Sequence, residues 1–118
     1  MAYKSYNKYN NKKTKVDGIM FDSKKEAKRY KELKLLKKAG VIRDLELQPR
    51  FLLLDTLRKN GKTFQKRYYY ADFMYYDNEK KKTVVEDVKG YKAKLYPIKR
   101  HIFEAKYPDL WVEEIWIS

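Results

Sequence analysis

The chain has 118 residues, enough for one domain with a modest core, and a formal net charge of +13. Such a charge indicates an anionic partner, whereas 16% aromatic residues argue against a disordered basic tail. The absence of cysteine excludes disulfides and thiolate zinc sites, so any metal must be held mainly by oxygen. Because the sequence has neither a membrane-length apolar run nor a signal peptide, we expect a cytoplasmic protein.

The first fifteen residues are expected to form a flexible basic arm. Residues 1–15 carry five lysines, three tyrosines and no acid, without helical or strand periodicity. Lys12 and Lys13 are candidate contacts to DNA phosphates, and the tyrosines could stack on bases. An inert solvated tail would have the same composition. The remaining residues, 16–118, are expected to form a single domain.

A helix is predicted over residues 24–39. Ser23 and Glu26 match the capping-box pattern at its start, and Gly40 follows its expected end. At 100° per residue the helix has an apolar arc, and Glu26 lies midway across it. The arc consists of Ala27, Tyr30, Leu33 and Leu36. The Glu26 carboxylate therefore either only completes the capping box or faces a partner inside the protein.

Strands are predicted after this helix. The segment RFLLL, residues 50–54, is typical of a strand, and Asn60-Gly61 indicates a tight turn between two strands. Two runs of aromatic and β-branched residues then flank the polar residues 77–82. We interpret these two runs as one long hairpin.

The register of this hairpin brings two acids together. If the turn is centred between residues 79 and 80, Asp72 faces Asp87 on the neighbouring strand. Side chains directly opposite in a sheet have Cβ atoms about 4.5 to 5.5 Å apart, and like charges there are destabilising. A positive charge is therefore expected between the two carboxylates.

Lys89, in the stretch VVEDVKG of residues 84–90, can supply that positive charge. Asp87 and Lys89 share one sheet face, whereas Glu86 points to the other face, toward solvent or a helix. Two carboxylates and one ammonium on one face could bind a hard divalent cation and activate a water beside it. Alternatively, Lys89 only neutralises the two aspartates in a surface ion network.

Together these residues resemble a nuclease family. Asp72 followed by Asp87-Val88-Lys89 on a hairpin, with Glu26 on the preceding helix, is similar to the PD-(D/E)XK nuclease superfamily. The blocks FDSKKEAKRYKEL, LQPRF, YYYADF and VVEDVKG together resemble small phage-encoded basic proteins within that superfamily. Those proteins look related to Holliday-junction resolvases of the RecU type.

The resemblance covers roughly residues 19–117 and carries a fold expectation. It implies an α/β, restriction-endonuclease-like core, with a mixed and mainly antiparallel sheet of about four or five strands flanked by two helices. One departure is Ala71, where the name of the superfamily would place proline.

The resemblance also implies roles for individual residues. Asp72 and Asp87 would ligate Mg²⁺, or Mn²⁺ in its place, together with the main-chain carbonyl of Val88. Glu26 would reach the same site directly or through a metal-bound water. Lys89 would orient or help to deprotonate the attacking water and steady the charge on the phosphate.

A second helix and a last strand are predicted near the C-terminus. Pro97 is placed to begin the helix and Pro108 to follow its end, and LWVEEIWIS, residues 110–118, is expected to close the sheet beside the hairpin. His101 is expected to be structural or on the surface. The face expected to pack consists of Ile98, Ile102 and Ala105.

Basic residues around this helix are candidate DNA contacts, because they follow the predicted site in the chain. Two of them, Lys99 and Arg100, are expected to project freely from the helix. The set consists of Lys92, Lys94, Lys99 and Arg100.

The favoured function is Mg²⁺-dependent hydrolysis of DNA phosphodiester bonds, and the resemblance favours branched DNA, a Holliday junction, as the substrate. Because a junction needs paired incisions and the domain offers one site, a homodimer is expected. One alternative is a nuclease that processes flaps or ends in repair or replication, and another is a non-catalytic nucleic-acid-binding protein. The acidic residues favour an enzyme, because carboxylates would only weaken a pure binder of anions.

Overall fold

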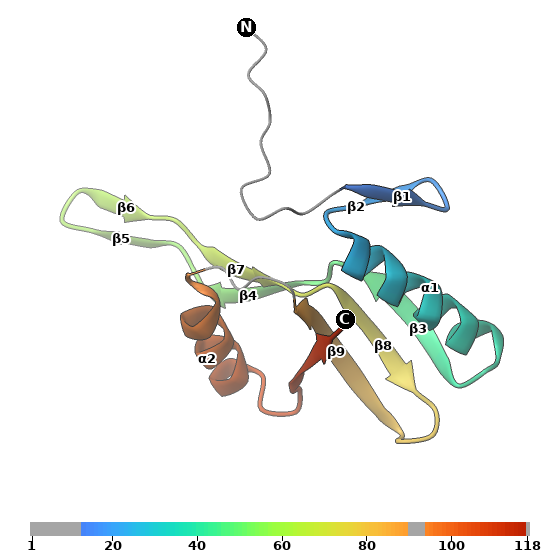
Figure 1. Ribbon diagram of the computed structural model, residues 1–118. Coiled ribbons are helices and arrows are strands. Elements are labelled where there is room, and N and C mark those ends of the chain that lie inside the picture. Colours follow the sequence, from blue (N-terminus) through green and yellow to red (C-terminus); the bar gives the residue numbers. More distant parts are fainter. Residues whose placement is uncertain (1–12, 90–93, 118) are drawn as a thin grey trace, which may run out of the picture.

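The computed structural model describes residues 13–89 and 94–117, so the predicted DNA contacts Lys12 and Lys92 lie outside the described residues. Within the described residues, the central sheet has four strands, with β10 parallel to β9 and the other neighbours antiparallel (Figure 1). In spatial order these strands are β10 (Val112–Trp116), β9 (Lys82–Lys89), β8 (Phe73–Asp77) and β3 (Ile42–Leu47).

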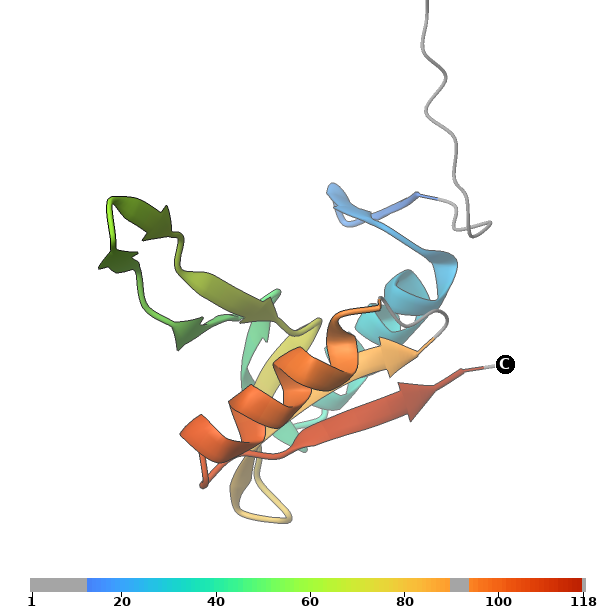
Figure 2. The ribbon, with the colours of Figure 1, turned by 90° about the vertical axis from the view of Figure 1, so that its left-hand side faces the viewer.

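Two helices, α1 (Lys24–Lys38) and α2 (Tyr96–Lys106), cover opposite faces of β9 (Figures 1 and 2). Val84 of β9 packs with residues of α1, whereas Val85 packs with residues of α2. Successive side chains of a strand point to opposite faces, so a strand buried on both sides carries apolar residues in succession. The predicted α/β class, with a mixed sheet and two helices, is confirmed.

The first helix begins and ends where predicted. The Ser23 hydroxyl accepts a hydrogen bond from the Glu26 backbone N–H at 3.1 Å, and Gly40 adopts a φ of +79° just beyond the last turn. The predicted apolar arc is the buried one, since Ala27, Tyr30 and Leu33 are all buried. The arc carries Glu26 toward the interior of the protein.

The β8–β9 hairpin has the predicted register. Its ladder runs from Asp77, paired with Lys82, to Phe73, paired with Glu86. Asp72 lies one residue beyond the last pair, and its N–H donates to the carbonyl of Glu86 at 2.9 Å. The carboxylate of Asp72 therefore enters the region opposite the end of β9.

The first run of the predicted hairpin is broken in the structure. Strand β7 (Arg67–Tyr70) leaves the hairpin at Ala71 and pairs with β4 (Arg50–Leu54), the strand predicted at residues 50–54. Beyond this ladder, β5 (Leu57–Lys59) and β6 (Lys62–Phe64) form an exposed hairpin that projects from the protein (Figure 1). Asn60 and Gly61 form its turn with φ of 52° and 73°, as predicted. We call residues 57–64 the projecting hairpin.

A hairpin at the start of the described residues was not predicted. Strands β1 (Thr14–Val16) and β2 (Ile19–Phe21) are joined by Asp17-Gly18, whose φ angles of 53° and 76° suit a tight turn. The predicted boundary of the basic arm at residue 15 is therefore wrong, because Thr14 and Lys15 already belong to a paired strand. The Asp-Gly pair was the sequence signal for this turn.

The second helix lies where predicted, but of the three residues expected to pack, Ile102 alone lies against the core. Ile98 is 60% exposed and Ala105 is also exposed, whereas Tyr96 and Phe103 are buried. Phe103 meets Phe51 of β4 edge-on, with ring centroids 4.9 Å apart, so large aromatic rings fill the space between α2 and the β4–β7 ladder. In the described part of the chain, no helix has both the length and the apolar character required to cross a membrane.

Candidate active site

The four predicted catalytic residues line one pocket of about 430 Å³. Glu26 reaches it from the first turn of α1, Asp72 from the link between β7 and β8, and Asp87 and Lys89 from the end of β9. The pocket is completed by Tyr69, Tyr70, Val88, Lys94, Leu95, Tyr96 and Lys99. Residues that lie far apart in the sequence thus meet where the two helices and the sheet converge.

Asp72 is held by the backbone of the strand opposite. Its Oδ2 accepts the N–H of Val88 at 2.6 Å, in a part of β9 that has already run past the last paired residue of β8. Burial, together with the nearby Glu26 carboxylate, raises the pKa of Asp72 to about 8. Burial and the charge of Asp22 likewise raise the pKa of Glu26 to about 7, while hydrogen bonds with Ser23 and Asp72 oppose the shift.

Asp87 and Lys89 share a sheet face, as alternation predicted. The Lys89 Nζ lies 3.3 Å from Oδ1 of Asp87, and the hydroxyl of Tyr69 donates to Oδ2 of Asp87 at 2.7 Å. The side chain of Lys89 is only 2% exposed, and its Nζ lies 3.4 Å from the ring centroid of Tyr96. Burial of this kind is unusual for a lysine and favours a specific role over a surface ion network.

Glu86 points to the opposite face, where it contacts a helix and not solvent. It is 1% exposed, and its two oxygens accept from Arg29 at 2.8 and 2.7 Å and from the hydroxyl of Tyr75. This bidentate pair joins α1 to β9 one turn after Glu26. It therefore fixes the helix that carries Glu26, a function of Arg29 that the sequence analysis missed.

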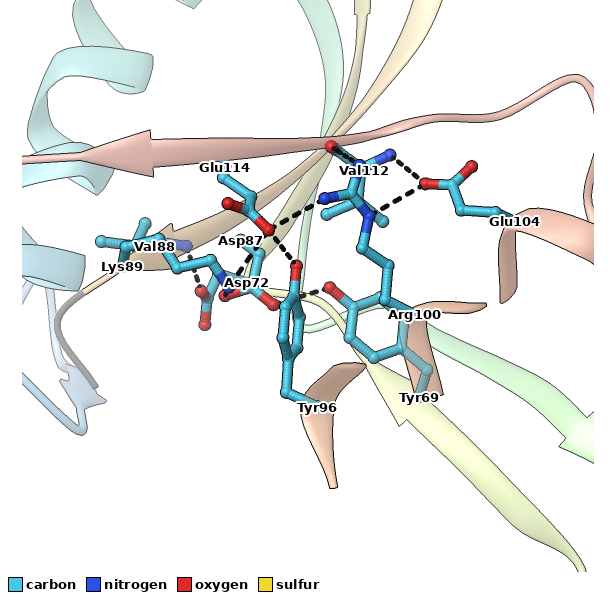
Figure 3. A network of polar contacts seen from close by, with 10 residues as sticks. All are labelled: Tyr69, Asp72, Asp87, Val88, Lys89, Tyr96, Arg100, Glu104, Val112 and Glu114. Carbon is cyan, nitrogen blue, oxygen red and sulfur yellow. Dashed lines mark hydrogen bonds and ion pairs between the residues drawn. The ribbon is translucent and has the colours of Figure 1, made fainter. Parts of the chain in front are cut away.

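A second polar network lies on the α2 side of the pocket (Figure 3). Glu114 of β10 is the parallel partner of Asp87, and its Oε2 accepts from the hydroxyl of Tyr96 at 2.9 Å and from Nη1 of Arg100 at 2.8 Å. The same oxygen lies 4.0 Å from Nζ of Lys89. Glu114 was not identified from the sequence, because its partners lie on other elements.

The expectation that Arg100 projects freely is wrong. Its guanidinium also donates to Glu104 at 3.2 Å and to the carbonyl of Val112 at 3.0 Å, and it stacks on Trp111 at 4.6 Å. Arg100 lies between Tyr96 and Phe103 on the helix surface that packs inward. Its charge is therefore used within the protein.

The other predicted DNA contacts have mixed positions. Lys94 and Lys99 line the pocket, and Lys13 is exposed at the start of the described residues. His101, which was expected to be structural or on the surface, is exposed on α2. A basic stretch was missed between residues 50 and 70, where Asp55 is the one acid. Its exposed cations are Arg50, Arg58, Lys59, Lys62, Lys66 and Arg67.

The donor set suits a hard divalent cation. Among residues 13–89 and 94–117, no three acidic or imidazole side chains already converge as the ligands of one metal ion. Three carboxylates nevertheless line one pocket, and the pKa of both Glu26 and Asp72 is raised by burial and by neighbouring negative charge. A cation would relieve this repulsion, and oxygen donors of this kind are those that Mg²⁺ prefers.

Comparison with known proteins gives a family and no function. No curated protein and no solved structure matches this chain. The model of one family, described as "Protein of unknown function (DUF1064)", matches residues 6–118. Because this match covers nearly the whole sequence, the chain belongs to the DUF1064 family.

Proposed function

We propose that this protein is a metal-dependent endonuclease that hydrolyses phosphodiester bonds in DNA. The observation that carries the proposal is the meeting of Glu26, Asp72 and Asp87 with the buried Lys89 in one pocket. Clustered carboxylates are unfavourable in a protein that only binds anions. Their presence beside a cationic surface is understandable if a metal ion mediates between them and a phosphate. We include in the proposal a restriction-endonuclease-like core of the PD-(D/E)XK type.

The residues of the pocket would have separate roles in metal binding and in hydrolysis. Asp72, Asp87 and the carbonyl of Val88 would hold Mg²⁺ or Mn²⁺, with Glu26 completing the set. The bound ion would supply Lewis-acid polarisation of the phosphate and a water of lowered pKa. Lys89, fixed against Asp87 at 3.3 Å, would orient the attacking water and balance negative charge on the phosphate.

Neighbouring residues would hold the site in position. The hydroxyl of Tyr69 fixes one oxygen of Asp87, and the N–H of Val88 fixes one oxygen of Asp72. Lys94 and Lys99, which line the pocket, would contact the phosphates that flank the scissile bond. These contacts need no base recognition, so the pocket itself favours no particular sequence.

The rest of the surface carries enough positive charge to bind a long polyanion such as DNA. The net charge is +13, and the exposed cations between residues 50 and 70 lie along β4, β7 and the projecting hairpin. Tyr70, at the end of β7, is 57% exposed and lines the pocket. From the resemblance to RecU-type resolvases we extend the proposal to branched DNA, with a four-way junction cut by a homodimer.

The test uses end-labelled four-way junction, flap, nicked and plain duplex DNA, each incubated with Mg²⁺, Mn²⁺ or EDTA. We expect cleavage of the junction with either metal and none with EDTA. Lys89→Ala should abolish cleavage and leave binding measurable, because the dispersed cations supply most of the affinity. Lys82→Ala, an exposed lysine at the other end of β9, is the matched control.

The outcomes separate the candidate functions. Junction binding without cleavage under any metal would support a non-catalytic nucleic-acid-binding protein. Preferential cutting of flaps or ends would support a processing nuclease. Light scattering of the free protein and of the junction complex tests for the dimer. A monomer in both states would exclude a resolvase that makes paired incisions, and a monomeric nuclease would remain the candidate function.

A further inference from the structure

Lys89 lies between two carboxylates that compete for it. Its Nζ is 3.3 Å from Oδ1 of Asp87 and 4.0 Å from Oε2 of Glu114. These two acids are direct partners in the parallel pairing of β9 and β10, so the ammonium could bond either with a small rotation of its chain. Asp87 lines the pocket, whereas Glu114 lies on the side of α2. Which acid holds the ammonium therefore decides where the charge of Lys89 acts.

Other donors already occupy the competing oxygen. Oε2 of Glu114 accepts from Nη1 of Arg100 at 2.8 Å and from the hydroxyl of Tyr96 at 2.9 Å, and both distances are shorter than that to Lys89 (Figure 3). A hydrogen bond between a guanidinium and a carboxylate is roughly twice as strong as one between neutral groups, and it offsets part of the negative charge of Glu114. Both lone pairs of Oε2 are thus used by Arg100 and Tyr96, which weakens the attraction of this oxygen for Lys89.

Arg100 is itself rigidly placed. Its Nε donates to Glu104 and its Nη2 to the carbonyl of Val112, while its face stacks on Trp111. The Tyr96 hydroxyl on Glu114 in turn sets the ring that lies 3.4 Å from the ammonium of Lys89. Residues of α2 and β10 thus pack around the ammonium of Lys89 on the side of Glu114.

We propose that Arg100 and Glu114 are positioning residues that keep the ammonium of Lys89 on Asp87, facing the pocket. Glu114 orients Tyr96 over Lys89, and Arg100 prevents Glu114 from capturing Lys89. The catalytic consequence rests on the nuclease function proposed above, but the placement of Lys89 does not. The proposal differs from the sequence-based expectation that Arg100 contacts DNA.

The kinetic test is a double-mutant cycle on cleavage of labelled DNA. Arg100→Gln leaves Glu114 unneutralised, so we expect kcat to fall about tenfold or more, with KM for DNA changed by less than about twofold. Glu114→Gln added to Arg100→Gln removes the competing charge and should restore most of kcat. A phosphate contact by Arg100 would instead raise KM, and Glu114→Gln would not rescue it.

A structural measurement tests the placement without activity. The ring of Tyr96 should shift the ε-methylene proton resonances of Lys89 upfield, and these resonances are assigned by their loss in Lys89→Arg. Arg100→Gln should move them toward the positions of an ordinary lysine, and the double variant should move them back. Arg43→Gln, on the far edge strand β3, is the control and should leave them unchanged.

The two measurements distinguish a failure of the proposed nuclease function from a failure of the positioning role. Wild-type protein that never cleaves DNA overturns the proposed nuclease function, while the lysine resonances still report on the positioning. Lys89 resonances that do not respond to Arg100→Gln, or a double variant that recovers neither resonance nor kcat, overturn the positioning role. If Arg100→Gln does not fold, Arg100→Met replaces it, because methionine keeps an unbranched side chain that can pack but carries no charge to neutralise Glu114, and the same outcomes apply.

Discussion

Asp72→Asn should stabilise the metal-free protein, and more so as the pH rises. Burial and the Glu26 carboxylate raise the pKa of Asp72 from 3.8 to about 8. Between these two pH values the folded state keeps a proton that the unfolded chain has released, so the stability of the wild type falls as the pH increases from about 4 to about 8. Asparagine carries no charge at any of these pH values. Its side-chain oxygen can still accept the N–H of Val88.

The magnitude follows from the shift. At 1.36 kcal/mol per pKa unit, moving the pKa from 3.8 to about 8 corresponds to an unfavourable contribution on the order of 5 kcal/mol at pH 8. Because burial is the largest cause of the shift, and asparagine is itself a polar side chain that is costly to bury, the substitution recovers only part of this. We expect Asp72→Asn to gain about 2 to 3 kcal/mol at pH 8 and about 1 kcal/mol at pH 5.

The assay is urea unfolding in EDTA at pH 5 and pH 8, followed by circular dichroism. Asp109→Asn, which removes an exposed carboxylate, controls for the change in net charge and should alter stability by less than about 0.5 kcal/mol. Millimolar Mg²⁺ should stabilise the wild type by preferential binding to the folded state, and Asp72→Asn should reduce that gain.

One result would refute the reasoning. If Asp72→Asn lowers stability at both pH values and leaves the Mg²⁺ response unchanged, the carboxyl of Asp72 makes only a favourable hydrogen bond. The aspartates would then share no metal site. Asp72→Ala, which also loses the bond from Val88, measures that hydrogen bond separately.

Two further predictions concern the scaffold and the surface. Arg29→Gln should destabilise the protein by about 3 to 5 kcal/mol, because it leaves the 1%-exposed Glu86 without its charged partner, and urea unfolding that shows a loss below 1 kcal/mol would contradict this. Replacing Arg58, Lys59 and Lys62 of the projecting hairpin by glutamine should weaken DNA binding and flatten its salt dependence, measured by fluorescence anisotropy at several salt concentrations. An unchanged salt slope would show that DNA does not reach this hairpin.

Short sequence patterns predicted several features of the fold, because those features depend on local interactions. The cap at Ser23 and the turn at Asn60-Gly61 depend on neighbouring backbone groups, so short patterns predicted them. The common face of Asp87 and Lys89 follows from the two-residue period of a strand and was equally predictable. These features need no knowledge of what packs against them.

The tertiary structure decided which polar groups are used inside the protein. Glu86 carries the same charge as its neighbour Asp87, yet it is buried because Arg29 arrives from a helix 57 residues away in the sequence. Arg100 was expected to project freely from α2 because it is charged, but β10 brings Glu114 to it. Such pairs depend on how separate elements meet. The period of a single segment carries no information about the partner on another.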